Sequence, residues 1–256
     1  SLDTFKLSRR DMLYLNTANS SVSSKTDYKS VIKTFMNIPP TSPIQNKKIY
    51  ICQISNDELS PHLTEMCDLV GAITGMDVVL IPSMKIQLQN NSLSLVYRNV
   101  KFNISMKEFD IGYSLNESNI IDIMNIVLFN DKVDIQSVFF ISSHLFHNDS
   151  GRKRDSIYNF ISTHREFDSL NKIVFNVCMR LLVKVIKSTG IQNCSVYRCL
   201  MNKNDTTDSI CPICRYSLYN KTGVSMRSIV NNVNKLNIDN RGLNAMLVKY
   251  SGRFNL

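Results

Sequence analysis

The stretch that decides the fold runs from Ser169 to Met201 and reads SLNKIVFNVCMRLLVKVIKSTGIQNCSVYRCLM. Its apolar residues recur every three or four positions, which is the period of a helix that buries one face. The apolar stripe consists of Leu170, Ile173, Val174, Val177, Cys178, Leu181, Leu182 and Val185. Asp168 or Ser169 is suited to cap the start, and Gly190 stands where the glycine that follows a helix belongs. The pattern predicts a long amphipathic helix over about 169–189.

Four cysteines follow this helix in the order Cys194-x4-Cys199-x11-Cys211-Pro-x-Cys214. Two cysteine pairs separated by a short loop can place four thiolates tetrahedrally around one Zn²⁺ ion. The Cys-Pro-x-Cys half is typical of such sites, because its turn points both sulfurs in one direction. A redox pair and unligated thiols are the alternatives. The spacing predicts one structural zinc ion bound by Cys194, Cys199, Cys211 and Cys214.

The chain has seven cysteines, an odd number, and its first residues, SLDTFKLSRRDMLYL, contain no apolar core of the kind that a signal peptide has. Both observations favour a reducing, cytoplasmic compartment in which thiols bind metal rather than form disulfides. Cys52, Cys67 and Cys178 lie in apolar segments, and we expect them to be buried packing residues. No stretch approaches the roughly 18 consecutive apolar residues of a membrane helix, so we expect no membrane partner.

Strands and helices alternate upstream of the long helix. KIYICQI at 48–54, a helix that starts at Ser60-Pro61 and MDVVLIPS at 76–83 together predict a βαβ unit. KIQLQ and SLSLVYRNVKFNI flank the turn-prone Asn90-Asn91 and predict a hairpin. Asn119–Phe129 predicts a largely buried helix, and SVFFIS and SIYNFIS are further strand candidates. The predicted fold class is α/β (α+β) with a mixed sheet.

The two ends of the chain differ from its middle. Residues 1–46 have no sustained periodicity and contain Ser and Thr clusters and the turn-rich NIPPTSP, which predicts an extended basic arm. Residues 47–222 form the predicted domain, with the cysteine-bearing zinc lobe at 190–219. Residues 223–256 are predicted to hold a helix near 225–236 and an irregular basic tail.

The chain is basic, because its 256 residues include 30 Lys+Arg against 21 Asp+Glu, a net charge of +9. With 43% hydrophobic residues it is globular rather than disordered, and a globular protein this basic often binds a polyanion. We expect the basic residues at both ends and in one central loop to contact RNA phosphates, by shape and without DNA specificity. They are Lys6, Arg9, Arg10, Arg152, Lys153, Arg154, Arg241, Lys249 and Arg253.

The residues from Val183 to Cys214 resemble the signature of the archaemetzincin family of zinc metalloproteases, H-E-x-x-H-x-x-G-x-x-H-C-x4-C-x-M followed by C-x-x-C. Six fixed positions match with the correct local spacing: Gly190, Cys194, Cys199, Met201, Cys211 and Cys214. KIYICQI and FISTHREF are also similar to the family's N-terminal pattern, so the resemblance covers about 47–218, with a shorter gap between Met201 and Cys211. It implies a metzincin-like fold in which the long helix is the former active-site helix.

The chain departs from the family at the positions that the resemblance assigns to catalysis. Val183, Lys187 and Asn193 stand where the three histidine ligands belong, and Lys184 stands where the glutamate base belongs. Valine cannot bind zinc, whereas an ammonium group repels the cation and cannot serve as the base at neutral pH. We therefore predict a pseudoprotease with no catalytic residues, and not an enzyme.

Three functions compete at this point. The first is a noncatalytic protein that binds RNA, with the ribosome as its partner, acting as a dormancy (hibernation) factor of the microsporidian kind; extended basic arms are typical of ribosome-bound proteins. The second is an active metalloprotease with relocated ligands, for which His144, His147 and His164 are the candidates. The third is a pseudoprotease whose former substrate cleft holds a protein partner.

Overall fold

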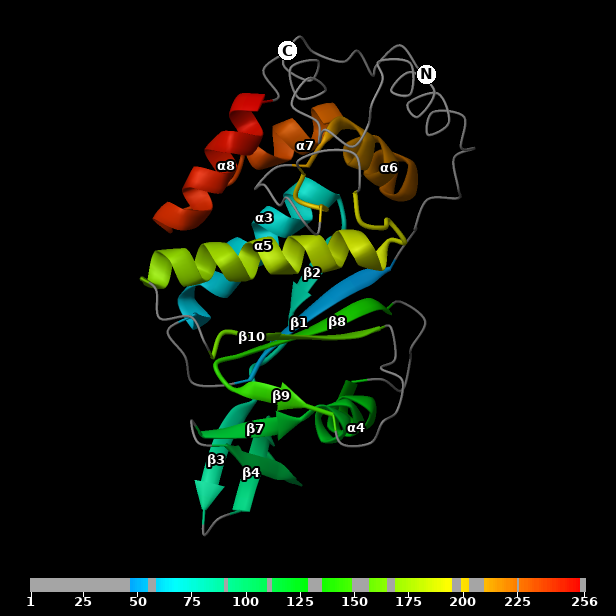
Figure 1. The fold of residues 1–256 in the computed structure, drawn as a ribbon. Helices are drawn as coiled ribbons and strands as arrows, with labels where there is room; N and C mark the ends of the chain where they lie inside the picture. The colour runs from blue at the N-terminus through cyan, green and yellow to red at the C-terminus, as the bar shows by residue number, and fades with distance from the viewer. Residues whose placement is uncertain are drawn as a thin grey trace.

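A parallel sheet of four strands, in the order β10-β8-β1-β2, lies at the centre of the molecule (Figure 1). The structure is a computed structural model that describes residues 47–54, 59–89, 92–109, 112–128, 135–148, 157–164, 169–194, 199–202, 210–224 and 226–253. The predicted basic arm, 1–46, lies outside these residues. The strands of the central sheet are β1 (Lys48–Gln53), β2 (Asp77–Leu80), β8 (Ile135–Ser142) and β10 (Tyr158–Ser162).

The central strands are apolar on both faces because both faces of the sheet are covered. Ile51 of β1 pairs with Leu80 of β2 on one side and with Phe139 of β8 on the other. Along β8 the side chains alternate: Phe139 points into the core under the helices, whereas Phe140 points into a second core on the opposite face. A parallel sheet with near-continuous apolar strands is the expected result of this double burial.

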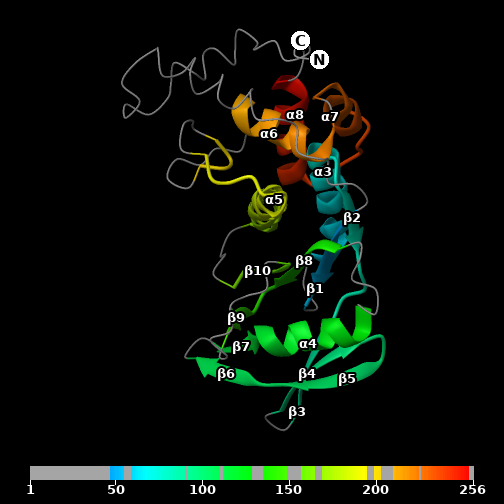
Figure 2. The same cartoon turned by 90° about the vertical axis from the view of Figure 1, so that its right-hand side faces the viewer.

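One face of the sheet, here called the helical side, is covered by two layers of helices (Figures 1 and 2). Helices α3 and α5 contact the strands, and α6, α7 and α8 lie outside them. The elements of this side are η2 (Ser60–His62), α3 (Leu63–Thr74), α5 (Leu170–Ser188), α6 (Pro212–Thr222), α7 (Met226–Val233) and α8 (Arg241–Arg253).

The opposite face, here called the hairpin side, carries one helix and two small sheets. The antiparallel sheet has the order β3-β4-β5, and the other, β6-β7-β9, mixes an antiparallel with a parallel pair. Asn116 ends β7 and begins the helix, because its side-chain oxygen accepts from the Ser118 amide at 2.9 Å. The elements are β3 (Lys85–Gln89), β4 (Ser92–Tyr97), β5 (Val100–Ile104), β6 (Met106–Phe109), β7 (Gly112–Asn116), α4 (Glu117–Leu128) and β9 (Leu145–His147).

The long helix predicted from the apolar stripe is confirmed as α5. Ser169 stands before it in an extended conformation, and its carbonyl oxygen accepts from the Lys172 and Ile173 amides. Gly190 follows it with φ of +88°, a left-handed conformation that suits glycine. The side chains that α5 buries are Val174, Val177, Cys178, Leu181, Leu182, Val185 and Ile186.

Other predicted elements are also found. The β1-α3-β2 segment is a parallel βαβ unit, and α3 ends at Gly75, whose φ is +70°. The hairpin around 90–91 is present, with Gln89 of β3 paired to Ser92 of β4. The helix expected over 119–129 is α4. No helix in the described part of the chain has the length and apolar character to cross a bilayer.

The C-terminal segment corrects one expectation. The tail after residue 236 was predicted to be irregular, but residues 241–253 form α8. Its first turn is fixed by Asn240, whose side-chain oxygen accepts from the Gly242 and Leu243 amides at 3.0 and 3.2 Å. Leu243 and Met246 are fully buried in the core shared with α3 and α5. Tertiary packing therefore stabilises a helix whose own apolar pattern is weak.

Candidate metal centre

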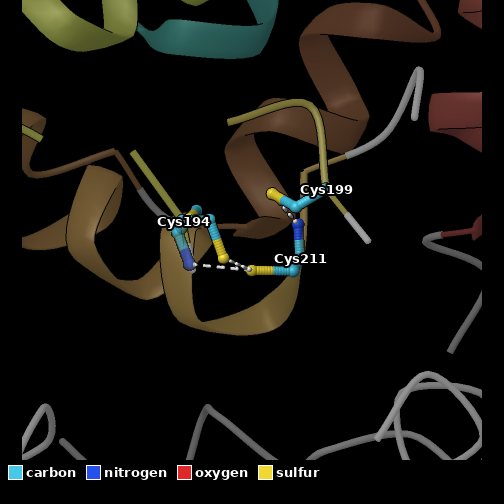
Figure 3. A group of neighbouring side chains, drawn as sticks. Cys194, Cys199 and Cys211 are labelled. Carbon is cyan, nitrogen blue, oxygen red and sulfur yellow. Dashed lines mark hydrogen bonds between the residues drawn. The ribbon is translucent and has the colours of Figure 1, made fainter. Parts of the chain in front are cut away.

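The four predicted cysteine ligands come together beside α5 and α6. Cys194 follows the turn after α5, Cys199 belongs to the next described segment, and Cys211 and Cys214 stand at the start of α6. All four side chains are buried, and their sulfur atoms lie within 4.8 Å of one another. Figure 3 shows that the sulfurs of Cys194 and Cys211 face each other.

Backbone hydrogen bonds hold two of the sulfurs in place. The Cys199 Sγ atom accepts from the amides of Met201 at 3.4 Å and Cys211 at 3.2 Å. The Cys211 Sγ atom caps α6 by accepting from the Cys214 amide at 3.5 Å, and Pro212 occupies the first turn, where no amide donor is needed. The Cys194 amide donates to the Met201 carbonyl at 2.9 Å, which ties Cys194 to the residues that follow Cys199. Amides of the described segments thus hold the Cys199 and Cys211 sulfurs, and Cys211 caps the helix that carries Cys214.

The cluster fits one zinc ion. Four sulfurs placed tetrahedrally about 2.3 Å from zinc are about 3.8 Å apart, and the Cys194 and Cys211 sulfurs are 3.8 Å apart. Contact with the Cys194 thiol, then with the Cys199 thiol, together with burial, raises the pKa of both Cys211 and Cys214. A divalent cation offsets this by stabilising the thiolates, and an all-sulfur tetrahedral donor set favours zinc.

The other three cysteines are buried among apolar side chains, as predicted. Cys52 lies in β1, Cys67 in α3 and Cys178 in α5, and none forms a disulfide. Burial raises the pKa of each thiol to about 12. These thiols are therefore protonated near neutral pH and act as small apolar side chains.

The positions that the resemblance assigns to catalysis lie on and after α5. Val183 is half-buried against the core of the helical side, and Lys184 one residue later is half-buried. Lys187 and Asn193 are exposed. Within the described ranges, the four cysteines are the only group of histidine, cysteine and carboxylate side chains placed to hold a metal ion.

The three histidines considered as relocated ligands do not form such a group, although all three are described. The His144 ring stacks on Tyr113 with centroids 4.7 Å apart. The His147 Nδ1 atom is hydrogen-bonded to the Ser114 hydroxyl at 2.6 Å, and His164 follows β10. Two of the imidazoles therefore pack against β7 on the hairpin side, which is the ordinary role of polar side chains at a sheet edge.

The residues expected to contact RNA are only partly described. Lys6, Arg9, Arg10, Arg152, Lys153 and Arg154 lie outside the described residues. Arg241 is exposed at the first position of α8. Lys249 and Arg253 belong to α8 as well, so the three C-terminal residues lie on a docked helix and not on an irregular tail.

Sequence reasoning overlooked a larger feature of the charge. Residues 169–256 contain 13 Lys+Arg against 3 Asp+Glu, whereas residues 1–168 contain 17 against 18. The two parts therefore carry +10 and −1, which together give the net charge of +9. Counting charge along the chain, rather than only at its ends, would have found it.

Comparisons with known proteins give structural similarity alone. The fold is similar to an archaemetzincin from Methanopyrus kandleri with 15% identity and a TM-score of 0.42, over 70% of this chain and 97% of that chain. It is also similar to a zinc-dependent peptidase from Methanocorpusculum labreanum with 11% identity and a TM-score of 0.43, over 66% of this chain and 99% of that chain. No protein-family model and no curated protein matches the sequence.

Proposed function

We propose that the protein is a noncatalytic zinc protein that binds structured RNA. Its proposed partner is the ribosome, on which it acts as a dormancy (hibernation) factor. The observation that carries the proposal is the pair of lysines on α5. Lys184 and Lys187 occupy the positions where the archaemetzincin signature has its base and its second ligand. One cation thus replaces the proton acceptor and the other replaces a zinc ligand, on a chain with a net charge of +9.

The case against catalysis is chemical. Peptide hydrolysis by a zinc ion in the family's site needs neutral imidazoles to hold the metal and a carboxylate to take the proton of the attacking water. Val183 offers hydrocarbon, packed half-buried against the core, and the amide of Asn193 is a poor substitute for imidazole. These replacements favour a pseudoprotease, a protease-like scaffold without catalytic activity.

The zinc lobe has a structural role in this proposal. When bound, zinc supplies a tetrahedral cross-link between four thiolates, with no coordination position open to a substrate. Cys194 and Cys199 fix the chain after α5, while Cys211 and Cys214 fix the start of α6. The cross-link orients the outer helices against the long helix.

The case for RNA rests on charge. Each phosphate that a lysine or arginine neutralises releases condensed counterions, so binding is strong at low salt and needs no base contacts. Exposed cations such as Lys187 and Arg241 are suited to phosphates of a double-helical RNA, which proteins recognise mainly by shape. We expect affinity to fall about a thousandfold between low and moderate salt if about six contacts form.

Metal content and peptidase assays test the noncatalytic part. Elemental analysis of the pure protein should give one zinc ion per chain, and two ions or none would contradict the proposal. Peptide libraries should remain uncut. Peptide turnover that chelators abolish, and that a Lys184→Ala change leaves intact, would instead support an enzyme with ligands elsewhere.

Sedimentation tests the partner. In a low-salt sucrose gradient of cell lysate the protein should travel with idle ribosomes rather than polysomes, and nuclease treatment should release it. It should also compete with tRNA or an elongation factor if it occupies a functional site. A protein that stays at the top of the gradient refutes the ribosome as partner. Co-purification that resists nuclease would favour a protein partner in the former cleft.

A further inference from the structure

The helices of this molecule divide sharply by charge. Helices α5, α6, α7 and α8 contain ten Lys+Arg and no Asp or Glu. Helices α3 and α4 contain four Asp+Glu and no Lys or Arg. A solvated helix surface usually mixes both signs, because opposite charges three or four residues apart stabilise it. One-signed charge on four consecutive helices therefore needs a separate explanation.

These basic helices lie together in space. Helix α8 packs against α5 and α7, and α7 packs against α3 (Figures 1 and 2). The Asn240 side chain donates to the Asn171 side chain at 3.1 Å, which joins the start of α8 to the start of α5. Gly242 lies so close to Asn171 that an added Cβ would be 2.3 Å from its carbonyl oxygen. Positive charges from consecutive helices thus accumulate on the helical side of the sheet.

Three cations on or beside the outer helices α7 and α8 are open to solvent. Arg227 of α7, Lys235 after α7 and Arg241 of α8 are all exposed. Asp239 is the one acidic residue among the described residues from 169 onward, and it is exposed too. Helix α8 has 13 residues and so is about 20 Å long. A surface of this extent spans several successive phosphates.

We infer that the outer helices α6–α8 form the phosphate-binding face of the molecule, with the backbone of double-helical RNA as the ligand. The inference rests on the proposed RNA-binding function and names the surface that performs it. Unbalanced like charge raises the free energy of the free protein through self-repulsion, and a polyanion relieves that repulsion on binding. Phosphate contacts from three adjacent helices would fix orientation without reading sequence.

The test compares two charge-matched triple variants of the full chain. The first is Arg227→Glu, Lys235→Glu and Arg241→Glu on the outer helices. The second is Lys47→Glu, Lys85→Glu and Lys101→Glu, three exposed cations at or near the N-terminal ends of β1, β3 and β5. Both change the net charge equally, so long-range steering is reduced in both. Binding to a labelled RNA stem-loop is measured by fluorescence anisotropy across a salt series.

The outer-helix variant should lose affinity about a hundredfold at low salt, and the slope of log affinity against log salt should fall by about 3, near one for each lost contact. The matched variant should keep the wild-type slope. Equal weakening of the two variants overturns the assigned face while leaving RNA binding intact. A wild-type protein that does not bind the stem-loop overturns the proposed function itself.

A variant that gains affinity serves as a second test, because misfolding can explain a loss of RNA binding but not a gain. Asp239→Lys should tighten binding about tenfold and steepen the salt slope by about 1, because it removes a repelling charge and adds one phosphate contact. Asp122→Lys on α4, also exposed, is the matched control and should change neither. Poly-glutamate that competes as well as RNA at equal charge concentration would assign the face to an acidic protein instead. If Asp239→Lys leaves both the affinity and the salt slope unchanged, the inference is contradicted.

Discussion

The helical side and the hairpin side of the parallel sheet both bury a continuous apolar core, yet they are held together differently. On the hairpin side, Leu95, Ile120 and Phe140 are fully buried in a core of apolar side chains. On the helical side, the segment from Cys194 to Cys214 also contributes four buried cysteines placed to bind one ion. The difference teaches that one zinc site can order a segment that would otherwise need much more buried apolar surface to fold.

The sharpest way to separate the two sides is to remove a zinc ligand. Cys211→Ser should abolish tight zinc binding, and structural zinc contributes on the order of 10 kcal/mol to local folding. Hydrogen exchange should then rise over 190–219 while the parallel sheet stays protected. Cys52→Ser in β1 is the matched control and should retain one zinc ion. Unchanged protection of the lobe in Cys211→Ser would show that packing, and not metal, holds it.

Deleting an aromatic side chain tests the hairpin side. Phe140 is fully buried and stacks on Phe160 with centroids 5.0 Å apart. Phe140→Ala should lower the free energy of unfolding by about 3–5 kcal/mol, because it removes apolar contact and leaves a cavity. Urea denaturation measures this change, and zinc content should remain one per chain. The exposed Ile126 of α4 offers a control, since Ile126→Ala should change stability by less than about 0.5 kcal/mol.

Two glycines on the helical side should respond unequally to alanine. An added Cβ at Gly242 would collide with the Asn171 backbone, so Gly242→Ala should cost about 2–3 kcal/mol and loosen α8. Gly190 has open space around it but a φ of +88°, so Gly190→Ala should cost only about 1 kcal/mol of strain. Urea denaturation of the two variants measures which one loses more free energy of unfolding. A larger cost at Gly190 would contradict the close docking of α8 on α5.

Thiol chemistry provides the smallest effect. The pKa of Cys52, Cys67 and Cys178 rises from 9.0 to about 12 in the folded chain, so these thiols should resist alkylation at pH 8 until the protein unfolds. Because the folded state keeps protons that the unfolded state loses, their contribution to stability is present below pH 9 and declines above it. Chelator treatment should expose four thiols to the reagent and leave these three unlabelled; mass spectrometry counts them.

Local patterns in the sequence were enough to predict much of this structure. The stripe from Leu170 to Val185 predicts α5 because every member of the period contributes to one face. The cysteine spacing predicts the metal centre because the members of each pair are close in the chain, and nearby amides such as those of Met201 and Cys214 donate to their sulfurs. These features depend on neighbours within a few residues.

What escaped prediction depends on distant neighbours. Strand β9 pairs in parallel with β7, and the Ser114–Leu145 register joins residues far apart in the chain. Helix α8 contains Gly242 and several polar residues, and it is ordered by docking on Asn171 rather than by its own period. The basic face escaped because charge was weighed at the two ends, whereas its members become neighbours only when α7 and α8 pack together.

One contact constrains how the chain folds while it is being made. The Glu65 carboxylate of α3 accepts from the backbone amides of Asp239 and Asn240, at 3.0 and 3.3 Å, across a separation of 174 residues for the first of these bonds. At a synthesis rate of about 5–20 residues per second, α3 waits about 9–35 s for this partner. During that interval the apolar surface that α7 and α8 later cover is open to chaperones and to other nascent chains. Codon usage or chaperone supply between these two points should therefore affect the yield of folded protein more than its final stability.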